Sequence, residues 1–236
     1  MFQELSESHR GEYCCRTSLN LYDSPTCSAW ATQVARGRHL QVLSQQPETQ
    51  ALQVRLCEDG YVAWLRVEDV VELERTDRVY QAIALSRTEI QQRIPEIINF
   101  AKNAMLQPNY YLWGGTLGPN YDCSGLIQAA FAASGIWLPR DSYQQAAFTQ
   151  NIAIEELLAG DLVFFGTPEK VNHVGLYLGD GCYIHSSGKD KGRNGIAIDL
   201  LSGKGDPISQ SYYRQFKQAG RVMVNYLVCR EDSHYS

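Results

Sequence analysis

One cysteine and two histidines have the types and spacing of a nucleophile with its base. Cys123 lies in the segment 121–125 (Tyr-Asp-Cys-Ser-Gly), directly before apolar residues at helical spacing. His173 and His185 follow in segments that have the pattern of β-strands. In cysteine hydrolases one imidazole removes the thiol proton and a further group orients that imidazole, so these residues predict nucleophilic catalysis.

The start of a helix would favour a reactive thiol at position 123. The first backbone N–H groups of a helix have no partner within it, and they carry partial positive charge. Such a position can lower the pKa of a thiol from about 8.5 to roughly 3.5–7.5. The same N–H groups can stabilise the oxyanion of an attacked carbonyl. The alternative, which position alone leaves open, is a cysteine packed in the core of an apolar helix.

A predicted hairpin brings the two histidines together. Residues 179–181 (Gly-Asp-Gly) predict a tight turn between two strands. A three-residue turn places Gly175 opposite His185, and His173 then lies diagonal to His185 on the same face, roughly 7–8 Å away at Cα. A shift of one residue would put the imidazoles on opposite faces. This geometry is symmetric and does not show which imidazole is the base.

The elements around these residues predict an α+β fold. Ser86 and Glu89 have the spacing of a capping box, and apolar residues at helical spacing continue to Met105. A second helix is expected over 123–134, with Gly135 as its stop. Strands are expected at 162–165, 173–178, 182–186, 196–200 and 221–229.

The first seventy residues predict a separate all-β unit. Short strand-like pieces alternate there with turn-forming residues, at 13–17, 28–34, 39–45, 51–56 and 60–67. So many short strands in so few residues are typical of a small barrel. We therefore expect a β-barrel at 1–73, a linker at 74–87 and an α+β domain at 88–236.

Composition limits the partners. The 236 residues are 44% hydrophobic, which is enough for two modest cores. The net charge of -5, without an obvious basic face, argues against nucleic acid. No apolar run approaches the ~20 residues that cross a bilayer, and the polar first residues lack the pattern of a secretory signal. We expect a cytoplasmic monomer with no nucleic-acid or membrane partner; the alternative that the sequence leaves open is an exported protein whose leader has been removed.

The cysteines do not predict a metal site or a disulfide framework. The seven are irregularly spaced and include no Cys-x-x-Cys pair, which favours free thiols over zinc ligands or disulfides. The glycine pair at 114–115 lacks the Lys-Ser/Thr of a phosphate-binding loop. We expect neither a metal nor a cofactor.

Six segments, in this order, resemble the NlpC family of papain-like bacterial cell-wall peptidases: 111–115, 122–126, 140–145, 160–165, 173–177 and 183–186. The resemblance covers roughly residues 88–230. It implies hydrolysis of the bond between γ-D-glutamate and a diamino acid in peptidoglycan-derived peptides. It further implies that Cys123 is the nucleophile, His173 the base and His185 the orienting residue, with Tyr111 beside the thiol.

The first unit resembles a bacterial Src-homology-3-like domain at residues 18–25 and 60–65. Family members with this pairing often cleave only stem peptides whose L-alanine amine is free, because the barrel closes one end of the cleft. The resemblance implies that a carboxylate faces the ammonium there, and that four residues contact the L-Ala-γ-D-Glu end: Tyr61, Asp122, Ser124 and Ser142. Asp23 is a further candidate for the ammonium. Such selectivity suits a cytoplasmic enzyme that recycles wall fragments.

Two other functions remain open from the sequence. An amidase or acyltransferase would use the same thiol on the same fold, because a fold does not determine the substrate. A non-catalytic wall-binding module would leave Cys123 unreactive.

Overall fold

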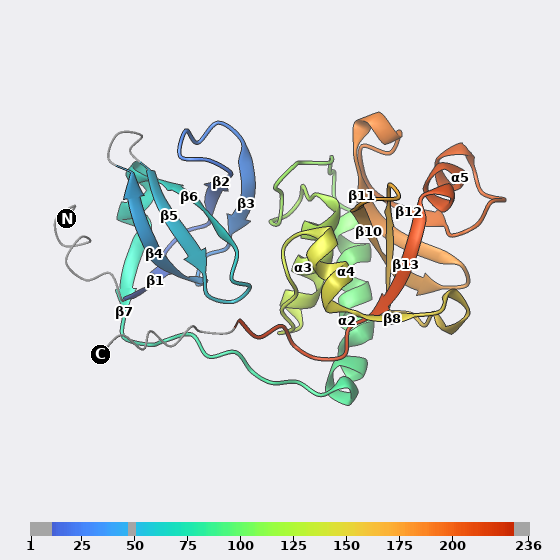
Figure 1. The fold of residues 1–236 in the computed structure, drawn as a ribbon, viewed down its shortest axis with the longest axis horizontal. Helices are drawn as coiled ribbons and strands as arrows, with labels where there is room; N and C mark the ends of the chain where they lie inside the picture. Colours follow the sequence, from blue (N-terminus) through green and yellow to red (C-terminus); the bar gives the residue numbers. More distant parts are fainter. Residues whose placement is uncertain (1–10, 47–50, 229–236) are drawn as a thin grey trace.

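The computed structural model describes residues 11–46 and 51–228. Figure 1 shows two units side by side, an all-β N-terminal unit and an α+β C-terminal unit. The predicted fold class is therefore confirmed.

The N-terminal unit is one antiparallel sheet of seven strands in the order β3-β2-β6-β5-β4-β1-β7. Its strands are β1 (Glu12–Cys15), β2 (Leu19–Tyr22), β3 (Trp30–Val34), β4 (His39–Gln46), β5 (Ala51–Leu56), β6 (Val62–Arg66) and β7 (Leu73–Thr76), with a 3₁₀ turn at Val67–Glu72. Every second residue of a strand points inward, so aliphatic side chains such as Leu21, Leu52 and Leu65 are fully buried. The sequence did not predict β2, and β7 lies within the segment predicted as a linker.

The C-terminal unit has an antiparallel sheet in the order β12-β11-β10-β9-β13-β8. Its strands are β8 (Gln150–Ile152), β9 (Leu162–Gly166), β10 (Val171–Gly179), β11 (Cys182–Ser187), β12 (Gly195–Leu200) and β13 (Phe216–Arg221). Its helices are α2 (Arg87–Met105), α3 (Cys123–Ala133), α4 (Ser142–Phe148) and α5 (Pro207–Arg214), and 3₁₀ turns lie at Ile154–Glu156 and Lys189–Lys191.

Helices cover both faces of this second sheet. Phe164 and Val174 face the core that α2 and α3 form with the sheet. Phe165 points to the other face and packs there with Tyr183 and with Tyr212 of α5. Adjacent strand residues face opposite sides of a sheet, so the run from Leu162 to Phe165 is apolar throughout because both sides are covered.

The starts of the two long helices agree with the sequence. Ser86 caps α2 through the expected capping box with Glu89, and Pro95 lies inside this helix rather than at its first turn. Asp122 caps α3, which begins at Cys123. Both helices start where local side chains satisfy backbone N–H groups that would otherwise lack a partner.

One predicted strand was wrong, and two short helices were not predicted. The last strand is Phe216–Arg221 instead of 221–229. Residues 222–228 are apolar apart from Asn225 but are not a strand, and they run back toward the N-terminal unit, where Val228 lies against Gly60 (Figure 1). The short helices α4 and α5 were not predicted, because seven or eight residues are too few for a clear helical period. Cys229, the end of the predicted strand, lies outside the described residues.

Polar contacts and one stacked pair join the two units. Arg140 Nε donates to Thr32 Oγ1 at 2.8 Å, and Thr116 Oγ1 donates to the Gln33 carbonyl at 2.9 Å. The guanidinium of Arg38 lies over the Trp137 ring, 4.5 Å from its centroid. These groups need partners of fixed geometry, so they hold the units in one relative orientation.

Among residues 11–46 and 51–228, no helix has the length and hydropathy to cross a membrane. The same residues contain no group of three or more His, Cys, Asp or Glu side chains that could hold a metal ion.

Candidate active site

Cys123 is the first residue of α3 and is 6% exposed. Its Sγ accepts hydrogen bonds from the backbone N–H groups of Ser124 and Val174. Val174 directly follows His173 on β10. The thiol thus lies between the helix start and the strand that carries the predicted base.

A close fit between α3 and the loop before it fixes the position of the thiol. Gly114 N donates to Asp122 Oδ2 at 3.0 Å, and Asp122 N donates to the Gly115 carbonyl at 3.0 Å. A Cβ atom on Gly125 would lie 2.0 Å from that same carbonyl oxygen. Only glycine permits this approach at the first turn of the helix.

The two histidines meet as the hairpin predicts. Leu176 pairs with Ile184, and this register places Gly175 opposite His185. A shift in pairing between Tyr177 and Gly179 makes the turn tighter than expected without changing the register at the histidines. His173 Nε2 lies 2.7 Å from His185 Nδ1, and the two rings meet edge to face.

Burial favours the neutral forms of the Cys123 thiol and of the two imidazoles. It raises the pKa of the Cys123 thiol to about 12, against the lowering effect of the Ser124 and Val174 N–H groups. It lowers the pKa of His173 well below its ordinary value, and the neighbouring His185 adds to that effect. Burial of the thiol thus acts against the lowered pKa that the helix start favours.

A carboxylate that the sequence analysis did not single out extends the pair. Asp199 of β12 places Oδ2 2.8 Å from His185 Nε2, and both side chains are fully buried. Burial raises the pKa of Asp199, but hydrogen bonds from His185, Arg193 and Ser209 bring it well below its ordinary value. Asp199 lies two residues from Ala197, which pairs with His185, so the strand register could have pointed to it had the pairing of β11 and β12 been known.

Two tyrosines surround these residues. The Tyr212 ring stacks on His173 with centroids 4.7 Å apart, and its hydroxyl lies 2.8 Å from Ser187 Oγ. Burial raises the pKa of Tyr111 and of Tyr212, and the charge of a Cys123 thiolate would raise both further. Both tyrosines are therefore neutral hydroxyls close to the thiol, as the sequence predicts for Tyr111.

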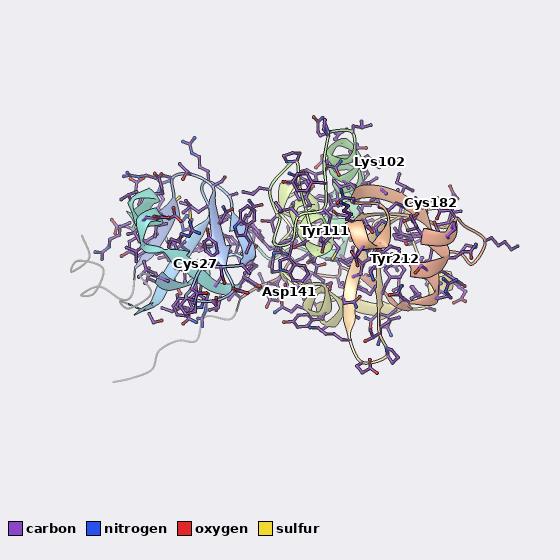
Figure 2. All side chains as sticks on the ribbon, turned by 90° about the horizontal axis from the view of Figure 1, so that it is seen from above. Cys27, Lys102, Tyr111, Asp141, Cys182 and Tyr212 are labelled. Carbon is purple, nitrogen blue, oxygen red and sulfur yellow. The ribbon has the colours of Figure 1, made fainter. Side chains whose placement is uncertain are left out.

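A cleft of about 300 Å³ opens onto Cys123 and is lined by both units. It contains every residue predicted to contact substrate: Tyr61, Tyr111, Asp122, Ser124, Ser142 and the further candidate Asp23. Trp30, Trp113, Asp141 and Lys170 also line it and had not been singled out. In Figure 2, Asp141 and Tyr111 lie on the side of the C-terminal unit that faces the first sheet.

Asp122 lines the cleft, but its charge is balanced inside the protein. Arg140 Nη2 donates to Asp122 Oδ2 at 2.6 Å, and Arg140 is 2% exposed. Asp122 also accepts from the backbone of Gly114 and Gly125. Asp122 therefore has little free charge to offer a substrate ammonium, and its predicted substrate contact stays a prediction.

Comparison with known proteins agrees with this geometry. Residues 108–218, which include the thiol and both histidines, match the model of the NlpC/P60 family. The chain carries an NlpC/P60 domain. Residues 21–70 match the model of the bacterial dipeptidyl-peptidase Sh3 domain. The cleft therefore lies where the Sh3 domain meets the NlpC/P60 domain.

Several curated proteins are similar to this chain. It is 32% identical over 169 residues to a gamma-D-glutamyl-L-lysine dipeptidyl-peptidase of Bacillus cereus, a match over 70% of this chain and 46% of that protein. It is 39% identical over 95 residues to the protein of the same name from Bacillus subtilis, a match over 39% of this chain and 30% of the other. The chain thus spans less than half the length of these relatives.

A solved structure of an NlpC/P60 family protein from Bacillus cereus aligns with this chain at a TM-score of 0.49 and 25% identity. The alignment covers 94% of this chain and 66% of that one.

Proposed function

We propose that this protein is a cysteine endopeptidase that hydrolyses the γ-D-glutamyl–diamino acid bond of peptidoglycan-derived peptides. The observation that carries the proposal is the buried thiol at the start of α3, beside a strand whose histidine is hydrogen-bonded to a second histidine. The NlpC/P60 match and the names of the two Bacillus relatives support the substrate class.

The site can perform both halves of the reaction. His173 accepts the thiol proton while Cys123 Sγ attacks the γ-carbonyl carbon, which forms the S–C bond of a tetrahedral intermediate. The N–H groups at the start of α3 favour the negative charge that develops beside the helix. Collapse breaks the C–N bond, and the His173 imidazolium returns its proton to the departing amine. Water then attacks the thioester carbon while His173 takes a proton from it. The C–S bond breaks, the acid is released, and His173 returns the proton to Cys123 Sγ.

The cleft also supports selectivity for a free L-alanine amine. Its wall from the first unit includes Asp23, Trp30 and Tyr61, so one end of the cleft is bounded by the Sh3 domain. An acyl or glycan group on the alanine nitrogen would have to displace that wall. We therefore propose that the substrates are released stem peptides with a free amine; the cytoplasmic location stays a prediction.

Asp141 is the carboxylate of the cleft best suited to the ammonium. Asp141 and Tyr61 both line the cleft, and the charge of Asp141 adds to the effect of burial in raising the pKa of Tyr61. Burial raises the pKa of the Asp141 carboxyl even though the guanidinium of Arg140 is near. A carboxyl in such a place gains stability from a further cation, which a substrate ammonium would supply.

The test uses the tripeptide L-Ala-γ-D-Glu-diamino acid, its N-acetylated form, and mass spectrometry of the products. We expect L-Ala-γ-D-Glu and the free diamino acid from the first peptide, and at least about tenfold slower cleavage of the second. Cys123→Ala should lower the rate by about 10⁴-fold or more, because the nucleophile is lost.

Cys182→Ala is the matched control, because Cys182 is another free cysteine, lies on the hairpin that carries His185, and does not line the cleft. Full activity of Cys123→Ala would remove the nucleophile from the proposal. Cleavage at another bond, or transfer to an added amine, would favour an amidase or acyltransferase. Equal rates for the free and acetylated peptides would overturn the amine selectivity alone.

A further inference from the structure

We propose that Asp199 is a positioning residue that sets the direction of proton transfer through the histidine pair. This inference rests on the proposed cysteine peptidase reaction and concerns one step of it, the removal of the thiol proton. The two histidines alone form a symmetric pair, in which either ring could donate to the other. Asp199 removes that symmetry, because it contacts only one of them directly.

The argument starts at the carboxylate. Asp199 is ionised and can only accept hydrogen bonds, so His185 Nε2, which lies 2.8 Å from its Oδ2, must carry a proton. A neutral His185 then has an unprotonated Nδ1 that can only accept. The nitrogen 2.7 Å away, His173 Nε2, must donate that hydrogen bond. A neutral His173 is left with an unprotonated Nδ1, which is the nitrogen available to take a proton from Cys123.

The other oxygen of the carboxylate holds it in this orientation. Asp199 Oδ1 accepts from Ser209 Oγ at 2.9 Å and from Arg193 Nη2, and Oδ2 accepts a longer hydrogen bond from Arg193 Nε at 3.3 Å besides its contact with His185. Arg193 Nη2 also donates to Asp206 at 2.7 Å, and Asp206 caps α5. With Oδ1 occupied by two donors, Oδ2 is the oxygen presented to His185. Ser209 of α5 and Arg193, which lies just before β12, thus hold Asp199 in place. Asp199 is the first residue of a series that continues through His185 and His173 to the thiol of Cys123.

The surroundings of the imidazole pair contain few other charges. Asp199 and Tyr212 lie beside the two rings. Six other titratable groups interact electrostatically with the rings or with these two residues: Cys123, Tyr183, Asp190, Lys191, Arg193 and Asp206. Asp199 is the anion that contacts the pair, so it also stabilises the imidazolium that forms when His173 takes the thiol proton. The alternative is that Asp199 serves only as the partner of Arg193 in a structural ion pair.

Nitrogen NMR of the wild-type protein, labelled at its histidine rings, tests the direction without a substrate. The chemical shift of each ring nitrogen shows whether it carries a proton. At neutral pH we expect Nε2–H and bare Nδ1 for both His173 and His185. An Nδ1–H signal for His185 would overturn the proposal. Because no peptide is involved, this result stands apart from whether the protein cleaves the proposed bond.

Asp199→Asn should reverse the direction. Arg193 Nη2 and Ser209 Oγ both donate to the Oδ1 position, whereas Arg193 reaches the Oδ2 position only through the longer bond from Nε at 3.3 Å. The amide oxygen will therefore occupy the Oδ1 position, and the amide NH₂ will face His185. His185 then accepts at Nε2 and donates from Nδ1, and His173 turns a protonated Nδ1 toward the thiol. We expect kcat to fall by about 10²- to 10⁴-fold, the range for losing a positioned base or the carboxylate that sets its tautomer. The rate of Cys123 alkylation should fall as well, with an Nδ1–H signal at His185.

Asp206→Asn is the matched control. It removes the same charge from the same arginine, asparagine can still cap α5, and Asp206 does not touch either histidine. We expect it to retain kcat within about threefold. An equal loss in both variants, or an Asp199→Asn variant that keeps Nε2–H and loses less than tenfold, would show a structural ion pair and overturn the proposal. If Asp199→Asn does not fold, the wild-type NMR measurement decides alone.

Discussion

Two buried polar networks lie on either side of Cys123, and they differ in whether a proton can move through them. On the helix side, Arg140 donates to Asp122 and Ser124 and reaches Thr32 of the first unit. On the sheet side, His173 and His185 lead to Asp199. Both networks are buried and hydrogen-bonded, as polar groups removed from water must be.

The helix-side network cannot release a proton under ordinary conditions. Burial lowers the pKa of Arg140, but Asp122 raises it well above its usual value, so the guanidinium stays charged. The Arg140–Asp122 ion pair therefore has a structural role, because it joins α3, the start of α4 and the first sheet. The sheet-side network holds two imidazoles whose pKa values are lowered by burial, and these are neutral and able to accept a proton. A network whose imidazoles can accept a proton thus lies beside one whose charges stay fixed.

The largest effect on stability should come from removing the ion pair between Arg140 and Asp122. Arg140→Met leaves Asp122 buried without its cation, and we expect a loss of about 3–5 kcal/mol in the free energy of unfolding. Urea unfolding followed by circular dichroism measures it. Arg16→Met breaks an ion pair whose side chains are both more than half exposed, and should cost less than about 1 kcal/mol. Similar losses in the two variants would contradict the comparison.

The sheet-side network predicts a pH dependence of stability. Folding lowers the pKa of His173 and His185, so below about pH 6.5 the unfolded chain binds protons that the folded protein does not. Stability should therefore fall as pH decreases from about 6.5 toward the folded pKa values, by up to about 1.4 kcal/mol per pH unit for each histidine.

Urea titrations at several pH values measure this slope. The double variant His173→Gln/His185→Gln, which removes both titrating groups, should flatten it. A slope that is the same in the variant would show that other groups cause the pH dependence.

The smallest effect concerns the bond between the units. Thr32→Val keeps the shape of the side chain but removes the acceptor for Arg140 Nε, and we expect a loss of about 1 kcal/mol. Thr17→Val, at an exposed threonine in the bend between β1 and β2, serves as the control in thermal unfolding. If Thr32→Val leaves the stability unchanged, the hydrogen bond between Arg140 and Thr32 does not stabilise the protein.

Local signals explain which elements could be predicted. The starts of α2 and α3 depend on side chains within three residues, so Ser86 and Asp122 mark them in the sequence. The meeting of His173 and His185 was predicted correctly although the turn is shorter than predicted, because the shift in pairing between Tyr177 and Gly179 restores the expected register at the histidines. The largely apolar residues 222–228 gave a false strand, since an apolar run does not show whether a neighbouring strand is there to pair with.

The sequence by itself determined the thiol at a helix start and the two imidazoles on one hairpin face, because each depends on short stretches of chain with a known period. Only the tertiary structure placed Asp199 against His185 and Arg140 against Asp122. Those contacts depend on which strands and helices become neighbours, and on lone pairs and charges that need partners once water is excluded. The role of a buried carboxylate depends on the hydrogen-bond donors around it. These donors come from distant parts of the sequence, so the sequence alone does not identify them.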